Sequence, residues 1–309
     1  MSRCRCPLEP SHRTIGRADL LGFLRAGATD GPGPCFGPSR SLRYTAKPPA
    51  SIGGSATAEI RLGTSGWDYP EWNGRVYPRS GTSDRLRFYS GMFPIVEINT
   101  TFYRLPPPSV AASWARRTPA RFRFAAKFPQ TITHDLRLVG TDAELARFLA
   151  VLSPLRDAGK FAAALLQLPP SLPFDPATVR AFYASLPRDL PVAVEFRERS
   201  WLTPASYALL REFGLAHVVI DGPHLPSVLE VTGPFAYVRW HGRGDPLWYD
   251  YTYSAAELAE WVPRIRALAE TVPVVYGFFN NHFRGDAAVN CRSLSEELGL
   301  PPAGRSRLD

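Results

Sequence analysis

The feature that most limits how this chain can fold is a regular alternation of short apolar runs with helical segments. The run from Ile95 to Tyr103 alternates β-branched or aromatic residues with polar ones, which predicts a strand. Because helical sequence follows this strand, it belongs in a parallel sheet that is covered on both faces. Seven further runs share these properties, so the predicted strands span residues 60–67, 95–103, 121–128, 162–168, 192–197, 217–221, 235–241 and 274–280.

Helices separate most of these strands. Three of them begin with recognisable start signals: Asp-Pro at 175–176, Thr-Pro at 203–204, and Ser254 three residues before Glu257. Only a short link follows the sixth strand. The predicted helices span residues 82–92, 109–117, 142–152, 175–185, 204–213, 254–270 and 286–298.

Eight strands in this order predict an α/β protein of the TIM type, a (β/α)8 barrel, with a single domain over residues 58–300. A missing sixth helix is a departure that such barrels tolerate. An open, doubly wound sheet is the competing interpretation. No Gly-x-Gly-x-x-Gly follows any of the strands, so the sequence does not indicate a dinucleotide cofactor.

Residues 1–57 are rich in Pro, Gly, Ser and Arg and lack periodicity, which predicts a disordered leader. A transit peptide or an over-extended reading frame would have a similar composition. The leader holds eight Lys or Arg against three Asp or Glu, which is +5 of the net charge of +8. The basic character therefore says little about the barrel, which we expect to fold without the leader; residues 301–309 are expected to form a tail.

The sequence gives no sign of a membrane segment or of secretion. No apolar run of about 18 residues is present, and the first residues lack the short apolar core of a secretory signal. The cysteines form no Cys-x-x-Cys pair, which favours reduced thiols. They are Cys4, Cys6, Cys35 and Cys291. We therefore expect a soluble, cytoplasmic protein that does not associate with membranes.

Polar side chains recur where the predicted strands end, which is where the active site of a TIM barrel lies. Apolar neighbours on both sides of Glu195 and of Arg239 indicate that these two side chains point inward. The candidate catalytic residues are Glu97, Lys127, Glu195, Asp221 and His241. The candidate substrate-binding residues are Trp67, Asn99, Tyr103, His134, Gln167, Arg197, Arg239 and Asn280.

Three cations among these candidates bear on the kind of ligand. The acids together with His241 could hold a divalent metal, but Lys127, Arg197 and Arg239 would oppose a cation and favour an anion. We therefore expect no metal and no cofactor, and a small polar substrate that carries phosphate or carboxylate. The same charges could instead form buried ion pairs with a purely structural role.

The side chain of Glu195 separates these interpretations. It shares its strand end with Arg197 and is expected to face two other carboxylates across the barrel mouth. We therefore expect Glu195→Gln to cost little stability while abolishing ligand binding. If Glu195 only neutralises Arg197 or Arg239, the substitution should instead cost roughly 3–5 kcal/mol.

Seven short motifs follow one another along the chain between Ile60 and Leu298. They are Gly-Thr-Ser-Gly-Trp at 63–67, Val-Glu-Ile-Asn-Thr-Thr-Phe-Tyr at 96–103, Lys127 with Ile-Thr-His at 132–134, Gln-Leu-Pro-Pro at 167–170, Val-Glu-Phe-Arg at 194–197 with Ser-Trp at 200–201, Arg-Trp-His-Gly at 239–242 and Phe-Asn-Asn at 279–281. In this order they resemble the YecE-like proteins, domain-of-unknown-function family seventy-two. The resemblance implies a TIM-type barrel and no established reaction. Trp240 stands where a smaller aliphatic residue is expected, which we interpret as an outward packing change.

The leading hypothesis is an enzyme of unknown reaction, with Glu195 or Glu97 as general acid or base and Lys127 as a buried amine of lowered pKa. One alternative is a glycoside hydrolase that uses two of Glu97, Glu195 and Asp221. Another is a protein that binds a nucleotide or nucleic acid without turnover.

Overall fold

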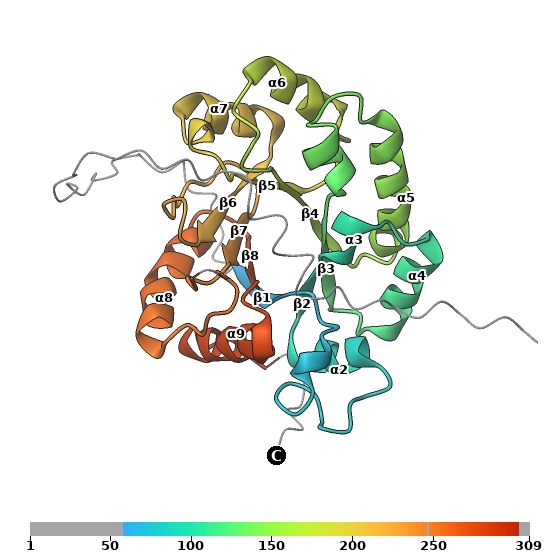
Figure 1. The fold of residues 1–309 in the computed structure, drawn as a ribbon, viewed down its shortest axis with the longest axis vertical. Helices are drawn as coiled ribbons and strands as arrows, with labels where there is room; N and C mark the ends of the chain where they lie inside the picture. Colours follow the sequence, from blue (N-terminus) through green and yellow to red (C-terminus); the bar gives the residue numbers. More distant parts are fainter. Residues whose placement is uncertain (1–57, 246, 303–309) are drawn as a thin grey trace, which may run out of the picture. The chain divides into compact units, whose positions relative to one another are not determined.

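A computed structural model of the chain describes residues 58–245 and 247–302. The predictions of a leader over residues 1–57 and of a tail over residues 301–309 lie outside these residues, apart from positions 301 and 302. Within them, eight strands close into a barrel in the order β1 to β8, with helices around it (Figure 1). The predicted TIM-type fold is confirmed.

All neighbouring strands in the barrel are parallel, and β8 pairs with β1 to close it. The strands are β1 (Glu59–Ser65), β2 (Ile95–Ile98), β3 (Arg123–Lys127), β4 (Phe161–Gln167), β5 (Val192–Glu195), β6 (Ala216–Asp221), β7 (Ala236–Trp240) and β8 (Val274–Phe279). Residues 222–235, which join β6 to β7 and are all described, contain no helix. The sequence predicted this short link.

Helices cover the outside of the barrel (Figure 1). They are α2 (Arg85–Met92), α4 (Pro108–Arg117), α5 (Asp142–Asp157), α6 (Pro176–Ser185), α7 (Pro204–Phe213), α8 (Ala255–Ala269) and α9 (Asp286–Glu297). The single turn α3 (Thr100–Tyr103) lies at the end of β2. Short turns of 3-10 or π type lie in the loops: η1 (Pro70–Trp72), η2 (Thr131–Asp135), η3 (Arg199–Trp201) and η4 (Phe283–Gly285).

The predicted helix starts are present. The side chain of Asp175 accepts hydrogen bonds from the first turn of α6, and the side chain of Thr203 does so at α7. Ser254 and Glu257 form a reciprocal capping box at α8. These caps satisfy backbone amides that a helix leaves free, so each helix begins at the residue that the sequence indicates.

The second strand is shorter than predicted. It ends at Ile98, and the residues up to Tyr103 form the single helical turn α3. Beyond Ile98 the polar residues of this segment have a different role from those in a strand. The hydroxyl of Thr101 lies 3.1 Å from the carbonyl oxygen of Ile98 and 2.7 Å from that of Lys127, and it donates to both. A polar residue that bonds to the backbone in this way can be mistaken in the sequence for one that alternates along a strand.

The interior of the barrel is filled by side chains, as in other barrels of this size. Several inward positions carry only alanine, which leaves room for the large inward side chains of Tyr237, Phe278 and Arg239. The alanines are Ala125, Ala163, Ala193 and Ala216. Larger apolar residues fill the layer between the strands and the helices.

Trp240 points away from the interior, as predicted. Its ring stacks on Phe279, with centroids 4.4 Å apart, and meets Trp261 of α8 edge-on at 5.2 Å. A Cβ atom at Gly277 would lie 2.7 Å from the Trp240 ring. The glycine on the neighbouring strand therefore makes the space that this large residue needs.

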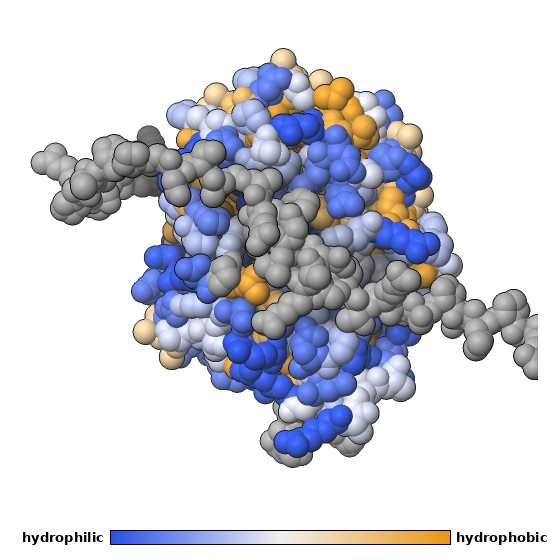
Figure 2. All heavy atoms as spheres, viewed as in Figure 1, coloured by the Kyte–Doolittle hydropathy of each residue, from blue (hydrophilic) through white to orange (hydrophobic). Residues whose placement is uncertain are grey.

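The visible face of the barrel is mostly hydrophilic, with small apolar areas between the polar ones (Figure 2). None of the helices in the described ranges combines the length and the apolar character needed to span a membrane.

Candidate functional site

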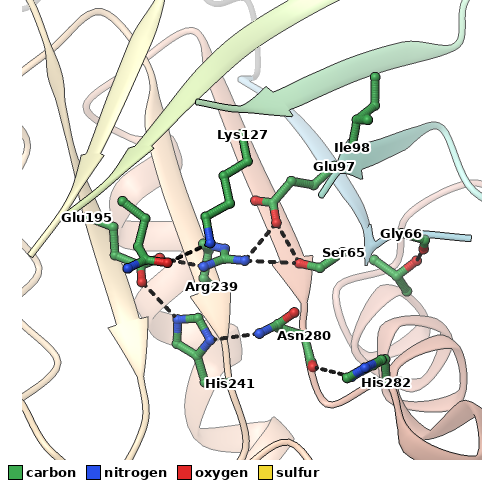
Figure 3. Close-up of polar contacts among 12 residues, drawn as sticks. Ser65, Gly66, Glu97, Ile98, Lys127, Glu195, Arg239, His241, Asn280 and His282 are labelled. Atoms are coloured by element: carbon green, nitrogen blue, oxygen red, sulfur yellow. Dashed lines mark hydrogen bonds and ion pairs between the residues drawn. The ribbon is translucent and has the colours of Figure 1, made fainter. Parts of the chain in front are cut away.

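Nine side chains from seven strands and the residues just after them gather at the C-terminal end of the barrel, and we call them the mouth cluster; most of them are labelled in Figure 3. They are Ser65, Glu97, Lys127, Gln167, Glu195, Arg197, Arg239, His241 and Asn280. Most residues of the mouth cluster come two positions after an apolar residue that points into the barrel, as Glu97 follows Ile95 and Glu195 follows Ala193. Residues two apart on a strand lie on the same face, so these polar side chains point into the barrel as well.

Arg239 lies at the centre of the cluster. Its Nη1 donates to Oε2 of Glu195 and its Nη2 donates to Oε1 of Glu97, both at 2.7 Å. All three side chains are at most 2% exposed. Burial by itself would lower the pKa of Arg239, but the two carboxylates raise it above its ordinary value. One guanidinium therefore bridges two buried carboxylates.

Glu97 receives two further hydrogen bonds. The hydroxyl of Ser65 donates to Oε1 and the hydroxyl of Tyr237 donates to Oε2, both at 2.7 Å. Sequence reasoning did not select either partner. Both could have been found from the strand period, because Ser65 ends β1 and Tyr237 precedes Arg239 by two residues on the same face.

Glu195 is surrounded by cations. Besides the bond from Arg239, its Oε1 accepts from Nε of Arg197 and lies 3.3 Å from Nε2 of His241. Burial would raise the pKa of Glu195, but Arg197 and Arg239 hold it well below its usual range. The expectation that Glu195 faces mainly like charges is therefore not met. Its carboxylate is ionised and serves two guanidinium groups.

His241 is a neutral side chain in this cluster. Burial, with the nearby charge of Arg197, lowers the pKa of the imidazole to about 3. Its Nε2 lies 2.9 Å from Nη2 of Arg197, and its Nδ1 lies 3.1 Å from Nδ2 of Asn280. The contact between His241 and Glu195 is therefore a contact with a neutral ring and adds no positive charge.

Lys127 differs from the two arginines. Its Nζ donates to Oε1 of Gln167 at 2.6 Å and lies 3.8 Å from the ring centroid of Phe102. No carboxylate of the described residues lies within ion-pair distance of it. Burial and the charge of Arg239 lower the pKa of Lys127 to about 7. Its amine is therefore largely uncharged at slightly alkaline pH.

The amino-acid composition adds a second signal for Lys127, which was already a candidate buried amine by its place near a strand end. The chain has 36 Lys and Arg residues, and only three of them are lysines: Lys47, Lys127 and Lys160. Lys160 donates to the carbonyl oxygens of Ala115 and Thr118, which end α4. Lys127 is thus the one lysine of the described residues whose amine lies in the barrel mouth.

The lowered pKa of Lys127 predicts a pH-dependent effect of Lys127→Met. The unfolded chain keeps this proton up to about pH 10.4, whereas the folded chain releases it near pH 7. Wild-type stability should therefore rise relative to the variant between these values, by up to about 4 kcal/mol. Urea melts of both proteins at about pH 6, 8 and 10 measure the difference, and a constant difference would contradict the lowered pKa.

Asp221 does not join the mouth cluster, although the sequence analysis placed it there. Its carboxylate accepts from Nη2 of Arg243 at 2.7 Å and from Nε1 of Trp261 in α8 at 2.9 Å. The preceding residue, Ile220, points into the barrel, so Asp221 points outward. Asp221 is therefore a link between the barrel and the helical layer.

This placement predicts a structural effect of Asp221→Asn. The variant loses the charge that holds Arg243 but can keep one oxygen for the indole of Trp261. We expect a loss of roughly 1.5–3 kcal/mol of unfolding free energy, the range for hydrogen bonds to charged groups. Denaturant melts measure it, and any ligand of the mouth should bind the variant with unchanged affinity. A loss of affinity for a ligand of the mouth, at unchanged stability, would show that Asp221 takes part in ligand binding.

Trp67 is also displaced from the mouth. Its ring meets Trp114 of α4 edge-on, with centroids 5.6 Å apart. Together with Arg85 and Arg117 it lines a cavity of about 290 Å³ beside α2 and α4. Trp67 therefore belongs to the side of the barrel.

The remaining candidates lie on the rim of the mouth. Tyr103 is 64% exposed. The ring of Phe102 lies between Tyr103 and His134 and meets both rings edge-on. The ring centroids of Phe102 and His134 are 5.0 Å apart. Burial and the nearby Lys127 lower the pKa of His134 to about 4, so this imidazole is neutral. Asn99 has a buried Oδ1 with no hydrogen-bond partner among the described residues.

The turn directly after β1 depends on a glycine. Gly66 has φ +88°, and a Cβ atom there would lie 2.5 Å from the hydroxyl of Tyr69. That hydroxyl donates to the carbonyl of Ser65 at 2.6 Å. Glycine therefore allows the chain to turn directly after Ser65 and keeps the strand end in place.

The acids and imidazoles of the cluster do not form a metal site. Within residues 58–245 and 247–302, no group of three His, Cys, Asp or Glu side chains is arranged to hold a metal ion.

Comparisons with known proteins agree with this architecture. The family model described as "Protein of unknown function DUF72" matches residues 61–307. The UPF0759 protein YunF of Bacillus subtilis is 31% identical over 277 residues, which are 79% of this chain and 96% of YunF. The UPF0759 protein YecE of Escherichia coli is 38% identical over 170 residues, which are 52% of this chain and 59% of YecE.

A solved structure supports the same assignment. The crystal structure of a DUF72 family protein from Thermotoga maritima is similar to this chain, with a TM-score of 0.73 and 32% sequence identity, over 78% of this chain and 99% of that protein. The match in sequence covers most of the barrel, and the match in structure covers nearly all of the relative. This chain therefore belongs to the YecE-like DUF72 family of proteins of unknown function.

Proposed function

We propose that this protein is a cytoplasmic enzyme that binds a small phosphate- or carboxylate-bearing substrate in the barrel mouth. The observation that carries the proposal is the charge balance of the mouth cluster. Two carboxylates, Glu97 and Glu195, stand against Arg239, Arg197 and the amine of Lys127, whose pKa of about 7 makes its charge depend on pH, while His241 is neutral. When Lys127 holds its proton, one positive charge is left over, and a bound anion would neutralise it.

Arg197 and Asn280 are the groups that we assign to substrate binding. Arg197 is 14% exposed and lies with its guanidinium 5.2 Å from the ring centroid of Trp248. Its Nε is held by Glu195, which orients the remaining nitrogens toward His241 and the mouth. A guanidinium fixed in this way suits a carboxylate or phosphate group.

Lys127 is the group that we assign to acid–base chemistry. Glu195 was a candidate for this role, but two guanidiniums saturate its oxygens and depress its pKa, which makes it a weak base. The pKa of Lys127, about 7, is near the optimum for proton transfer at neutral pH. We therefore place the proton transfer on the amine of Lys127.

The glycoside-hydrolase alternative loses its support in this geometry. That reaction needs one carboxylic acid that stays protonated and a second carboxylate beside the sugar. Glu195 is held ionised, and Asp221 faces α8 on the outside of the barrel. Glu97 therefore lacks the second carboxyl group that this mechanism requires.

The anion site is tested by thermal melts with inorganic phosphate, against sodium chloride of equal ionic strength. We expect phosphate to raise the Tm of the wild type in a saturable way. The increment should vanish in Arg197→Gln and persist in Arg264→Gln, where the arginine lies in α8 and contacts Glu260 and the ring of Trp261 rather than the mouth cluster. Equal increments in all three proteins, or none in the wild type, would refute the anion site.

Turnover is tested by incubating a mixture of small phosphorylated and carboxylated metabolites with the enzyme and following them by mass spectrometry. The wild type should consume at least one of them, and Lys127→Met should leave it unchanged. A mixture that stays unchanged with the wild type, although phosphate binds, would reduce the proposal to a binding protein.

A further inference from the structure

Lys127 occupies a position where an arginine would bind an anion better. A guanidinium offers five donors in a planar fork, whereas an ammonium group is a compact point charge. This chain uses arginine for all but three of its 36 Lys and Arg residues. A lysine in the mouth therefore points to a property that arginine lacks, which is the ability to lose its proton and react as an amine.

The surroundings of Lys127 suit a neutral amine. Its Nζ has one hydrogen-bond acceptor, the amide oxygen of Gln167, and lies over the ring of Phe102, whose face attracts a cation more weakly than a carboxylate partner would. The guanidiniums of Arg239 and Arg197 oppose a proton on it. Desolvation and neighbouring cations are the two ways in which proteins activate lysine for attack on carbonyl carbon.

We propose that Lys127 forms an imine with an aldehyde or ketone substrate that also carries an anionic group. This inference rests on the proposed anion site and deepens it by naming the substrate class as carbonyl compounds. In the step, Nζ attacks the carbonyl carbon and a proton moves to the carbonyl oxygen, giving a carbinolamine. That intermediate takes up one more proton and loses water, which leaves a protonated imine between Lys127 and the substrate.

The cluster contains groups that fit the other requirements of this step. His134 is neutral, and its ring lies edge-on to Phe102, the same ring over which the Lys127 amine lies, so the imidazole adds no positive charge near the amine. The side chains of Glu97 and Glu195 favour a positive charge at the Lys127 nitrogen, and they would favour the charge of a protonated imine there in the same way. Arg197 would hold the anionic end of the same molecule.

The test uses glyoxylate, the smallest aldehyde that carries a carboxylate, with sodium cyanoborohydride to reduce any imine to a stable secondary amine. Full-length protein is labelled at neutral pH, and the adduct on each lysine is quantified by peptide mass spectrometry. We expect Lys127 to be labelled at least about tenfold faster than free Nα-acetyl-lysine, because far more of its amine is neutral at this pH. Lys160, whose amine is buried and held by three acceptors, serves as the internal control.

A pH profile of the wild type keeps the test independent of variants. Labelling of Lys127 should level off above about pH 7, whereas that of acetyl-lysine should keep rising toward pH 10. Labelling of Lys127 that is no faster than that of acetyl-lysine, or that rises in parallel with it, overturns the proposal. Lys127→Arg should remove this adduct and retain the stabilisation by phosphate.

The two proposals fail in different ways. If phosphate stabilises the protein but Lys127 is unreactive, the anion site stands and the imine is overturned. If Lys127 is labelled rapidly but excess phosphate does not slow the labelling by glyoxylate, the reactive amine stands and the anion site is overturned.

Discussion

Replacing Arg239 by methionine is expected to lower the free energy of unfolding by at least roughly 3–5 kcal/mol, the cost of breaking a buried ion pair. The value should lie at or above the upper end, because one guanidinium serves two carboxylates, Glu195 and Glu97, that are both completely buried. Methionine is unbranched and apolar, is shorter than arginine and cannot neutralise either carboxylate. Urea melts at neutral pH measure the loss.

The loss should depend on pH in a defined direction. In the wild type the pKa of Glu195 lies well below its unfolded value of 4.5, so its contribution to stability is fully present above that value. It is lost as the pH falls through the depressed folded pKa. The deficit of Arg239→Met should therefore be largest near pH 7 and should shrink as the solution becomes acidic.

Arg264→Met is the matched control for this prediction. Arg264 of α8 is 36% exposed, its pair with Glu260 spans 3.8 Å and its guanidinium lies 5.0 Å from the ring centroid of Trp261, so its removal should cost only about 1 kcal/mol. If Arg239→Met cost no more than this control, the two carboxylates of the mouth could not both be ionised and paired as the contacts indicate.

Glu195→Gln should be destabilising by roughly 3–5 kcal/mol, which reverses the expectation from the sequence. The amide would keep the shape of the side chain but leave Arg239 with one carboxylate and Arg197 with none. An exposed glutamate of α8, Glu260, offers a matched Glu→Gln control, for which we expect a change within about 0.5 kcal/mol.

A double-mutant cycle identifies the cause of this loss. Glu195 and Arg197 are in direct contact, so Glu195→Gln together with Arg197→Met should cost less than the sum of the single changes. Strictly additive losses would show that the carboxylate is held by something other than this cation. A stable Glu195→Gln protein with abolished phosphate binding would restore Glu195 as a purely functional acid or base.

The strand period by itself was enough to find most of the mouth cluster. Alternation along a strand depends only on backbone geometry. The apolar neighbours of Glu97, Glu195 and Arg239 show which face of each strand is which, so the sequence predicts that these three side chains point inward. The number and order of strands likewise follow from local patterns. Eight of them, with helices between most, leave few ways to bury every apolar face.

The same reasoning failed for Asp221 because β6 is buried on both faces. Val218 and Ile220 fill the interior and Val219 fills the outer layer. Because residues on both faces are apolar, the sequence pattern does not show which residues of β6 point inward. An error of one residue in such a strand moves a side chain to the opposite face. Only the packed barrel shows that Asp221 faces Trp261 and Arg243.

The sequence by itself determined the barrel and most of the charged residues at its mouth. The tertiary structure decided how those charges pair: Arg239 with two carboxylates, Arg197 with Glu195, and Lys127 with none among the described residues. Pairing depends on distances of a few ångströms between strands that are far apart along the chain. Local patterns do not contain those distances, because they arise only when β8 closes on β1 and the strand ends meet.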